Sequence, residues 1–239
     1  MKVALALIFI FAAVQSRSVQ PLEEGTSAPW LVHLRFARST GGGLLESCVG
    51  VLINQSWVAT TGSCGRDVTF VWIRYNAQRV IQPELISETS QVRVHPAYNP
   101  QTGENDIALI SLNRVIPLSD TIAVASLADE AADVPETSTL CGYGENADGG
   151  PGDELSCFAV SLEADGDIIV ASSEDGAATG YDLGSPLVDN DALLGILVRA
   201  GDNDNAGVFL KTAQFAEWIE EVTAAEPAID FHEVQVAEF

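Results

Sequence analysis

Short segments rich in β-branched and aromatic residues recur along most of the chain. Residues 68–75 (VTFVWIRY) are the clearest, and residues 30–36 alternate in part between apolar and polar side chains, as a half-buried strand does. Turns rich in glycine or acidic residues, such as 41–43 and 145–154, separate these segments. Near the end, residues 212–223 repeat their apolar side chains at helical spacing. The pattern predicts an all-β fold of paired β-barrels with a single C-terminal helix.

The other expected strands form two groups on either side of a connector at residues 117–121. They span residues 48–53, 56–61, 80–86, 91–94 and 106–112 in the first group, and 122–127, 137–142, 155–162, 168–171, 186–188, 193–199 and 208–211 in the second. The last residues, 224–239, show no strong pattern and are expected to form a tail.

The first 18 residues have the pattern of a secretory signal peptide. Lys2 precedes an apolar run at residues 3–14, and Ser16 and Ser18 are small residues suited to a cleavage site. The apolar run is too short to span a bilayer. We therefore expect a secreted, extracellular protein of about 220 residues, long enough for one large all-β domain or two small ones.

The chain is strongly acidic. It has 11 Lys and Arg against 34 Asp and Glu, for a formal net charge of −23. Such a charge repels nucleic acid and anionic membranes, so we expect neither as a partner, and a monomer is assumed. The charge favours basic partners or none, and solubility in a crowded secretion is preferred over a specific basic partner as its explanation.

Four cysteines, Cys48, Cys64, Cys141 and Cys157, predict two disulfides in an oxidising compartment, with three pairings open. Scattered cysteines in a secreted chain favour disulfides over zinc. The acidic turns lack the full pattern of a calcium loop, so no metal and no cofactor are expected. Asn54-Gln55-Ser56 is a glycosylation sequon at a predicted turn, and Asn54 is the expected site.

Several motifs resemble those of the chymotrypsin-like serine proteases (trypsin family, S1). Residues 180–187 (GYDLGSPL) resemble the active-site loop GDSGGPL, residues 48–64 the block around the catalytic histidine, and residues 105–110 (NDIALI) the block of the catalytic aspartate. Residues 142–144 (GYG) and 207–211 (GVFLK) resemble two further family segments. The motifs occur in family order, and the overall style is similar to invertebrate, especially insect, members.

The resemblance implies two six-stranded Greek-key β-barrels followed by a C-terminal helix. The trypsin-like domain would span residues 19–223, with barrel one at about 28–117, barrel two at about 118–211 and the helix at 212–223. It also implies a Cys48–Cys64 disulfide, because the family bridges these positions.

The chain departs from the family at the positions that carry the chemistry. Leu183 stands at the nucleophile position and cannot attack a carbonyl, and Ser63 stands at the position of the histidine base. Asp106 is retained, so the degenerate triad positions are Ser63, Asp106 and Leu183. Tyr181 replaces a glycine whose amide helps to bind the oxyanion.

Further departures affect the substrate cleft and activation. Residues 198–200 (VRA) stand where the family has Ser-Trp-Gly, and Thr179 takes one position of a missing cysteine pair. Residues 17–22 lack the glycine pair of the family's activation site, although Asp182, which would receive the freed amine, is present.

No other residue is expected to rescue catalysis. His33, His95 and His232 are interpreted as unrelated strand or surface residues, and Ser185 as a small residue where the family has glycine. Asp106 is expected to be buried and satisfied by backbone donors and the Ser63 hydroxyl.

These departures predict a secreted, catalytically inactive protease homologue that is not an enzyme. It would act by binding a protease, an inhibitor or another secreted protein. Two alternatives stay open: a serine-type endopeptidase with a relocated active site, and an acidic bulk secreted or structural protein.

Overall fold

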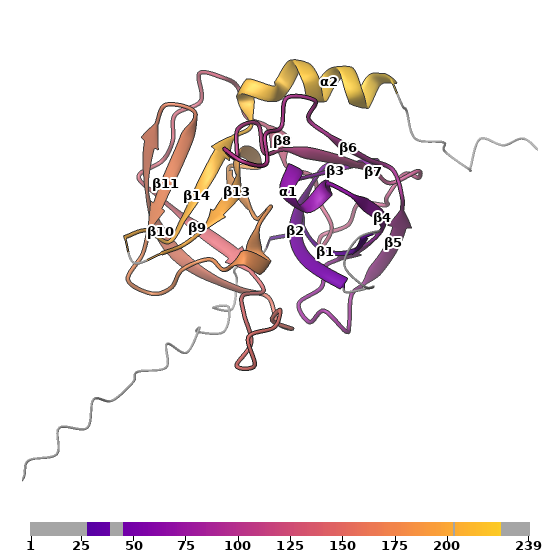
Figure 1. The fold of residues 1–239 in the computed structure, drawn as a ribbon, viewed down its shortest axis with the longest axis horizontal. Coiled ribbons are helices and arrows are strands. Elements are labelled where there is room, and N and C mark those ends of the chain that lie inside the picture. Colours follow the sequence, from indigo (N-terminus) through magenta and orange to yellow (C-terminus); the bar gives the residue numbers. More distant parts are fainter. Residues whose placement is uncertain (1–27, 39–44, 203, 226–239) are drawn as a thin grey trace, which may run out of the picture.

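Two curled β-sheets lie side by side and form the two halves of the structure (Figure 1). The structure is a computed structural model and describes residues 28–38, 45–202 and 204–225. The signal peptide expected at residues 1–18, the segment 17–22, the turn at 41–43 and most of the tail lie outside the described residues.

The first sheet is antiparallel throughout, with the strand order β5-β4-β1-β2-β3-β7-β6. Its strands are β1 (Leu31–Arg38), β2 (Leu45–Asn54), β3 (Trp57–Thr60), β4 (Val68–Tyr75), β5 (Leu85–Thr89), β6 (Val92–Val94) and β7 (Ala108–Ser111). Alternation turns side chains such as Phe36, Ile73 and Ile110 inward, where they form one buried apolar cluster.

The second sheet has the order β12-β13-β14-β11-β10-β9, and a short β8 pairs in parallel with β13. Its strands are β8 (Ser126–Leu127), β9 (Thr137–Gly142), β10 (Ser156–Asp165), β11 (Ile168–Ser172), β12 (Pro186–Asp189), β13 (Ala192–Ala200) and β14 (Gly207–Lys211). Val160, Ile169 and Phe209 belong to its own apolar cluster.

The expected all-β fold of two barrels with one C-terminal helix is confirmed. Each sheet has seven strands rather than six, because a break after Thr89 separates β5 from β6 and the two-residue β8 joins the second sheet. The strand expected at residues 80–86 is wrong. Asn76 adopts a positive φ of 43°, and Gln82 N–H donates to the Arg79 carbonyl at 2.9 Å, so the chain turns there and β5 begins at Leu85.

A third apolar cluster joins the two halves. Trp57 and Ile107 of the first half pack in it with Leu193 and Leu210 of the second. The helix α2 (Ala216–Ala225), which follows a short 3₁₀ turn at Ala213–Phe215, adds Ile219 to this cluster. It thus lies across the first half although it follows the second (Figure 1). The domain limits given above stay predictions.

Two disulfides join cysteines that are near in sequence. Cys48–Cys64 connects β2 to the short helix α1 (Gly62–Gly65), and Cys141–Cys157 connects β9 to β10. Each has a sequence separation of 16 residues. Each disulfide therefore stabilises the fold by about 3 kcal/mol, because it restricts the conformations of the unfolded chain. Asn54 lies exposed at the turn between β2 and β3, where its glycosylation stays a prediction.

Two buried serines give a matched test of the packing. Ser185 Oγ has no hydrogen-bond partner among the described residues, whereas Ser87 Oγ shares a 2.8 Å hydrogen bond with the Tyr75 hydroxyl. Ser185→Ala should raise the free energy of unfolding by about 1 kcal/mol, because it removes an unpaired buried hydroxyl. Ser87→Ala should lower it by about 1–2 kcal/mol, because Tyr75 loses its partner. Urea denaturation of both variants checks the pair, and equal losses would contradict it.

Candidate functional site

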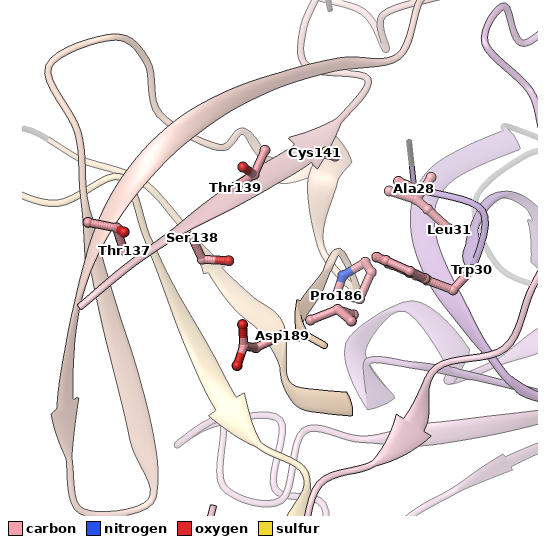
Figure 2. Close-up of a pocket in the computed structure, with 10 residues that line it drawn as sticks. Ala28, Trp30, Leu31, Thr137, Ser138, Thr139, Cys141, Pro186 and Asp189 are labelled. Atoms are coloured by element: carbon pink, nitrogen blue, oxygen red, sulfur yellow. The ribbon is translucent and has the colours of Figure 1, made fainter. Parts of the chain in front are cut away.

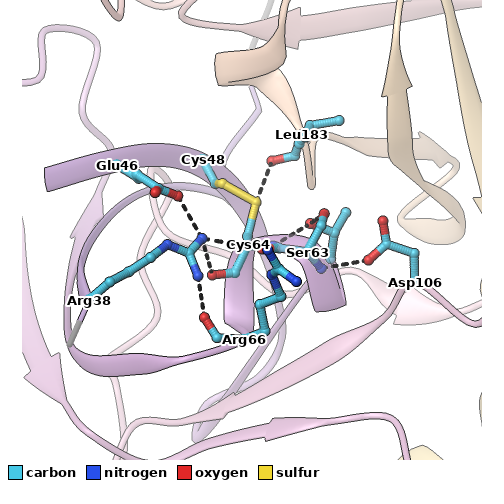
Figure 3. Close-up of polar contacts among 9 residues, drawn as sticks. Arg38, Glu46, Cys48, Ser63, Cys64, Arg66, Asp106 and Leu183 are labelled. Carbon is cyan, nitrogen blue, oxygen red and sulfur yellow. Dashed lines mark hydrogen bonds and ion pairs between the residues drawn. A yellow bond between two sulfur atoms is a disulfide. The ribbon is translucent and has the colours of Figure 1, made fainter. Parts of the chain in front are cut away.

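The three positions singled out from the sequence meet beside the Cys48–Cys64 disulfide (Figure 3). Ser63 lies in α1, Asp106 precedes β7, and Leu183 follows the 3₁₀ turn η1 (Gly180–Asp182). Ser63 N–H donates to Asp106 Oδ1 at 2.6 Å. The Leu183 carbonyl accepts from Val49 N–H at 2.8 Å and lies 3.9 Å from Cys64 Sγ.

Asp106 is a buried carboxylate held by the start of α1. The backbone amides of Gly62 and Ser63 both donate to it. Burial raises the pKa of the Asp106 carboxyl above its usual value, and these hydrogen bonds oppose the shift. The Ser63 hydroxyl, in addition, donates to Thr61 Oγ1 at 3.0 Å. The retained aspartate therefore positions α1.

Arg38 fixes the other end of α1, a role that the sequence did not reveal. Its guanidinium donates to the carbonyls of Ser63 at 3.2 Å, of Cys64 at 3.1 Å and of Arg66, and pairs with Glu46 at 2.6 Å (Figure 3). A cation at the carbonyl end of a helix is stabilising. No spacing rule connects Arg38 with residues 25 to 28 positions away.

Leu183 serves as a packing residue in this structure. Its partly buried side chain contacts the interior cluster of the first barrel, which includes Cys48 and Cys64. The next residue, Gly184, has a φ of 89°, and a Cβ there would lie 2.0 Å from the Val49 carbonyl oxygen. The glycine of the motif is therefore required by the close approach of the loop to β2.

The Asp182 carboxylate is satisfied within the second barrel. It accepts from Thr179 N–H at 2.7 Å, from the Thr179 hydroxyl at 2.9 Å and from Gly144 N–H at 2.8 Å. A Cβ on Gly142 would lie 2.2 Å from Asp182 Oδ1. Residues 142–144 thus form a cradle for this carboxylate, which explains Gly142, whereas Gly144 has a positive φ of 65° that favours glycine.

The amide expected to bind an oxyanion donates within its own loop. Tyr181 N–H donates to Thr179 Oγ1 at 3.2 Å, and the Tyr181 hydroxyl donates to the Gly149 carbonyl at 3.0 Å. Thr179, at the position of a missing cysteine, is therefore the cap that organises η1.

The segments adjoining Thr179 and residues 198–200 are in contact with one another. Ala178 N–H donates to the Ala206 carbonyl at 2.8 Å, and its carbonyl accepts from Gly201 N–H at 2.9 Å. A Cβ on Gly201 would lie 2.7 Å from Ala177 Cβ, and one on Gly207 would lie 2.6 Å from Leu197 Cδ1. These contacts leave no room for a large side chain between the segments.

The described histidines do not join the site. His33 is buried and packs edge-on against Tyr143, with ring centroids 4.8 Å apart, and burial with the nearby arginines Arg74 and Arg35 lowers the pKa of His33 to about 3. His95 packs against Phe215 and Trp218 beside α2. His232 lies outside the described residues.

Two pockets lie beside this region. One, of about 780 Å³, touches Thr179 and Asp182, and its lining includes five carboxylates and one guanidinium. The other, of about 320 Å³, lies between the segment entering β1 and strands β9 and β12, where the Ser138 hydroxyl points towards Pro186 and Trp30 (Figure 2). Neither pocket is lined by Ser63, Asp106 or Leu183.

Two barrels with these loops between them define a trypsin-like serine protease fold. The family model described as "Trypsin" matches residues 19–219, and the chain belongs to this family.

Curated relatives and solved structures agree with this assignment. The chain is 36% identical to human chymotrypsin-like elastase family member 3A over 52% of this chain and 49% of the relative. It is 27% identical to human kallikrein-4 over 74% of this chain and 78% of the relative, and 26% identical to porcine trypsin over 74% and 86%. The structure of HL collagenase superposes with a TM-score of 0.73 at 19% identity, covering 83% of this chain and 94% of the other.

The prediction that the chain is not an enzyme is contradicted by these similarities. The family and the relatives are serine endopeptidases, and the match extends over residues 19–219. The prediction depended on departures at individual positions, above all Ser63 and Leu183, whereas class membership follows from the match over the whole domain.

The Thr179 cap gives a stability prediction. Thr179→Ala removes hydrogen bonds to the Tyr181 amide and to the buried Asp182 carboxylate, and should lower the free energy of unfolding by about 2 kcal/mol. Thr102→Ala, in an exposed loop, is the control and should change it by less than about 0.5 kcal/mol. Thermal denaturation measures both, and an unchanged midpoint for Thr179→Ala would contradict the capping role.

Asp106 gives a pH prediction. Because its pKa is raised in the folded state, that state binds more protons, and this carboxyl's contribution to stability falls as pH rises above its ordinary pKa. Asp106→Asn should therefore gain stability relative to the native chain as pH rises from about 3 to 7. Urea denaturation across this range measures the difference, with the exposed Glu104→Gln as control. A difference independent of pH would contradict it.

Proposed function

We propose that the chain is a secreted protein that acts by binding other proteins and regulates proteolysis. Its partner would be a protease, a protease inhibitor or another secreted protein. The observation that carries the proposal is the loop at residues 179–184, whose polar groups are used inside the chain. The Tyr181 amide donates to Thr179, and the Leu183 side chain packs against the first barrel.

Binding needs a rigid surface, and acyl transfer needs a nucleophile, a base and free oxyanion donors. The loop provides rigidity through the three hydrogen bonds to Asp182 and the contact of Gly184 with β2. The pocket beside Asp182, with its five carboxylates, supports a basic protein segment as the ligand.

Secretion is part of the proposal. The signal-like residues 1–18 and the two disulfides support it, because disulfides persist in oxidising compartments. Within the described ranges, no helix has the length and apolar character needed to cross a membrane. An invertebrate origin is also a proposal, since the reported relatives are human and porcine.

The test measures the hydrolysis of a fluorogenic peptide by trypsin, with and without a protein inhibitor, as purified chain is added. We expect a saturable change in rate. Glu145→Gln with Asp153→Asn, at the acidic pocket, should weaken it, whereas the exposed pair Asp129→Asn with Glu130→Gln should not. If the chain neither changes the rate nor binds either protein, the proposal is wrong and a bulk secreted role gains support.

Peptide hydrolysis is the second candidate, and family membership favours it. Its reacting serine would not be residue 183. Ser63 lies beside Asp106, whereas Ser185 is fully buried. A fluorophosphonate probe followed by mass spectrometry tests this candidate. A label on Ser63 of the folded chain, lost in Ser63→Ala, would support it, and an unlabelled chain would reject it.

A further inference from the structure

Part of the outer surface of the first sheet is not covered by the second. Val71, Ile73 and Tyr75 of β4 point into the interior cluster, so Phe70, Trp72 and Arg74 point outward. On β1 the same alternation turns Arg35 outward, and on β5 it exposes Ile86, whose side chain is 50% exposed. We call Arg35, Phe70, Trp72, Arg74 and Ile86 the basic aromatic face.

The strand register makes these residues one continuous surface. Arg35 lies opposite Trp72 in the β1–β4 pair, and Arg74 lies opposite Ile86 in the β4–β5 pair. Side chains directly opposite in an antiparallel pair are neighbours. The Phe70 and Trp72 rings pack edge-to-face with centroids 4.6 Å apart. In Figure 1, β4 and β5 lie on the side of the molecule away from the second barrel.

The two arginines of this face have only neutral partners. Arg35 Nη1 donates to Ser47 Oγ at 2.6 Å, and Arg74 Nη1 donates to His33 Nδ1 at 3.3 Å. In the part of the chain that the structure describes, neither forms an ion pair with a carboxylate. Burial and then Arg35 lower the pKa of the Arg74 guanidinium, so an anion placed against both would relieve their repulsion.

The distribution of charge marks this face as the place for an anionic partner. After the expected signal peptide, seven of the nine Lys and Arg residues precede residue 118, whereas 26 of the 34 Asp and Glu residues follow it. An acidic segment is therefore repelled by the second half and directed towards the first.

The face itself carries little negative charge. Glu88, opposite Trp72, is the one carboxylate on these outward positions of β4 and β5.

We propose that the basic aromatic face binds an acidic polypeptide segment whose carboxylates pair with Arg35 and Arg74 and whose apolar side chains cover Phe70, Trp72 and Ile86. Arginine and aromatic side chains together are typical of the energetically important centre of protein interfaces. This inference rests on the proposed binding function and supplies it with a second surface, opposite in charge to the pocket beside Asp182.

The test uses the full purified chain and a fluorescent peptide of alternating Glu and Phe, with binding followed by anisotropy. We expect saturable binding that weakens at high salt, and no binding of a peptide of alternating Lys and Phe. Arg35→Gln should weaken it at least about tenfold, because a charge-assisted hydrogen bond is lost. The matched control is Arg199→Gln, which removes the same charge from an exposed position of the second barrel and should leave binding unchanged. Trp72→Ala should also weaken binding, because the peptide's apolar side chains lose their aromatic contact. The thermal midpoints of all three variants verify that they fold.

Each remaining outcome decides the matter. Equal losses in Arg35→Gln and Arg199→Gln would overturn the proposal, since net charge alone would then explain the binding. Preference for a single-stranded oligonucleotide over the Glu-Phe peptide would also overturn it, as would dimerisation of the chain that is lost in Arg35→Gln. If the peptide does not bind while the chain still alters trypsin, this inference falls and the proposed function stands. If the peptide binds but the chain has no effect on trypsin or its inhibitor, this inference stands and the proposed regulation of proteolysis falls.

Discussion

The buried carboxylate of Asp182 holds together the segments on which the candidate site depends. Its three hydrogen bonds join Thr179, η1 and the segment at residues 142–144. Gly142 has no room for a Cβ because of this side chain, and Thr179 in turn holds the Tyr181 amide. Since an unpaired buried carboxylate is costly, these residues are constrained together whatever chemistry the loop performs.

A similar constraint holds the first barrel against this loop. The Cys48–Cys64 disulfide, Asp106 and Arg38 fix α1 from three sides, and Gly184 lies against the Val49 carbonyl. These residues of the protease motifs therefore have structural roles that do not depend on catalysis. This explains how family membership remains evident over residues 19–219 while positions 63 and 183 hold Ser63 and Leu183.

The two halves of the chain also differ in what they offer a partner. The second half contains most of the carboxylates, several of them around the pocket beside Asp182. The first half presents arginines and aromatic rings on β1 and β4. A chain with surfaces of opposite charge can orient two different partners, or two parts of one partner, and steer their approach.

The sequence by itself determined the all-β class, most strands, the single C-terminal helix and the family, because alternation, turn residues and short motifs are local signals. It also identified Ser63, Asp106 and Leu183 as positions to examine. Only the tertiary structure decided the surroundings of those positions and the roles of other residues. It shows that Thr179 caps η1, that Arg38 holds α1, that the Ala178 backbone joins the neighbouring segments, and that Arg35 lies beside Trp72. Apart from the local Thr179 cap, these contacts join residues distant in sequence, and a local pattern cannot specify which of many possible partners each residue meets. The wrong strand at residues 80–86 has a local cause instead, because the positive φ of Asn76 and a turn outweighed an apolar run.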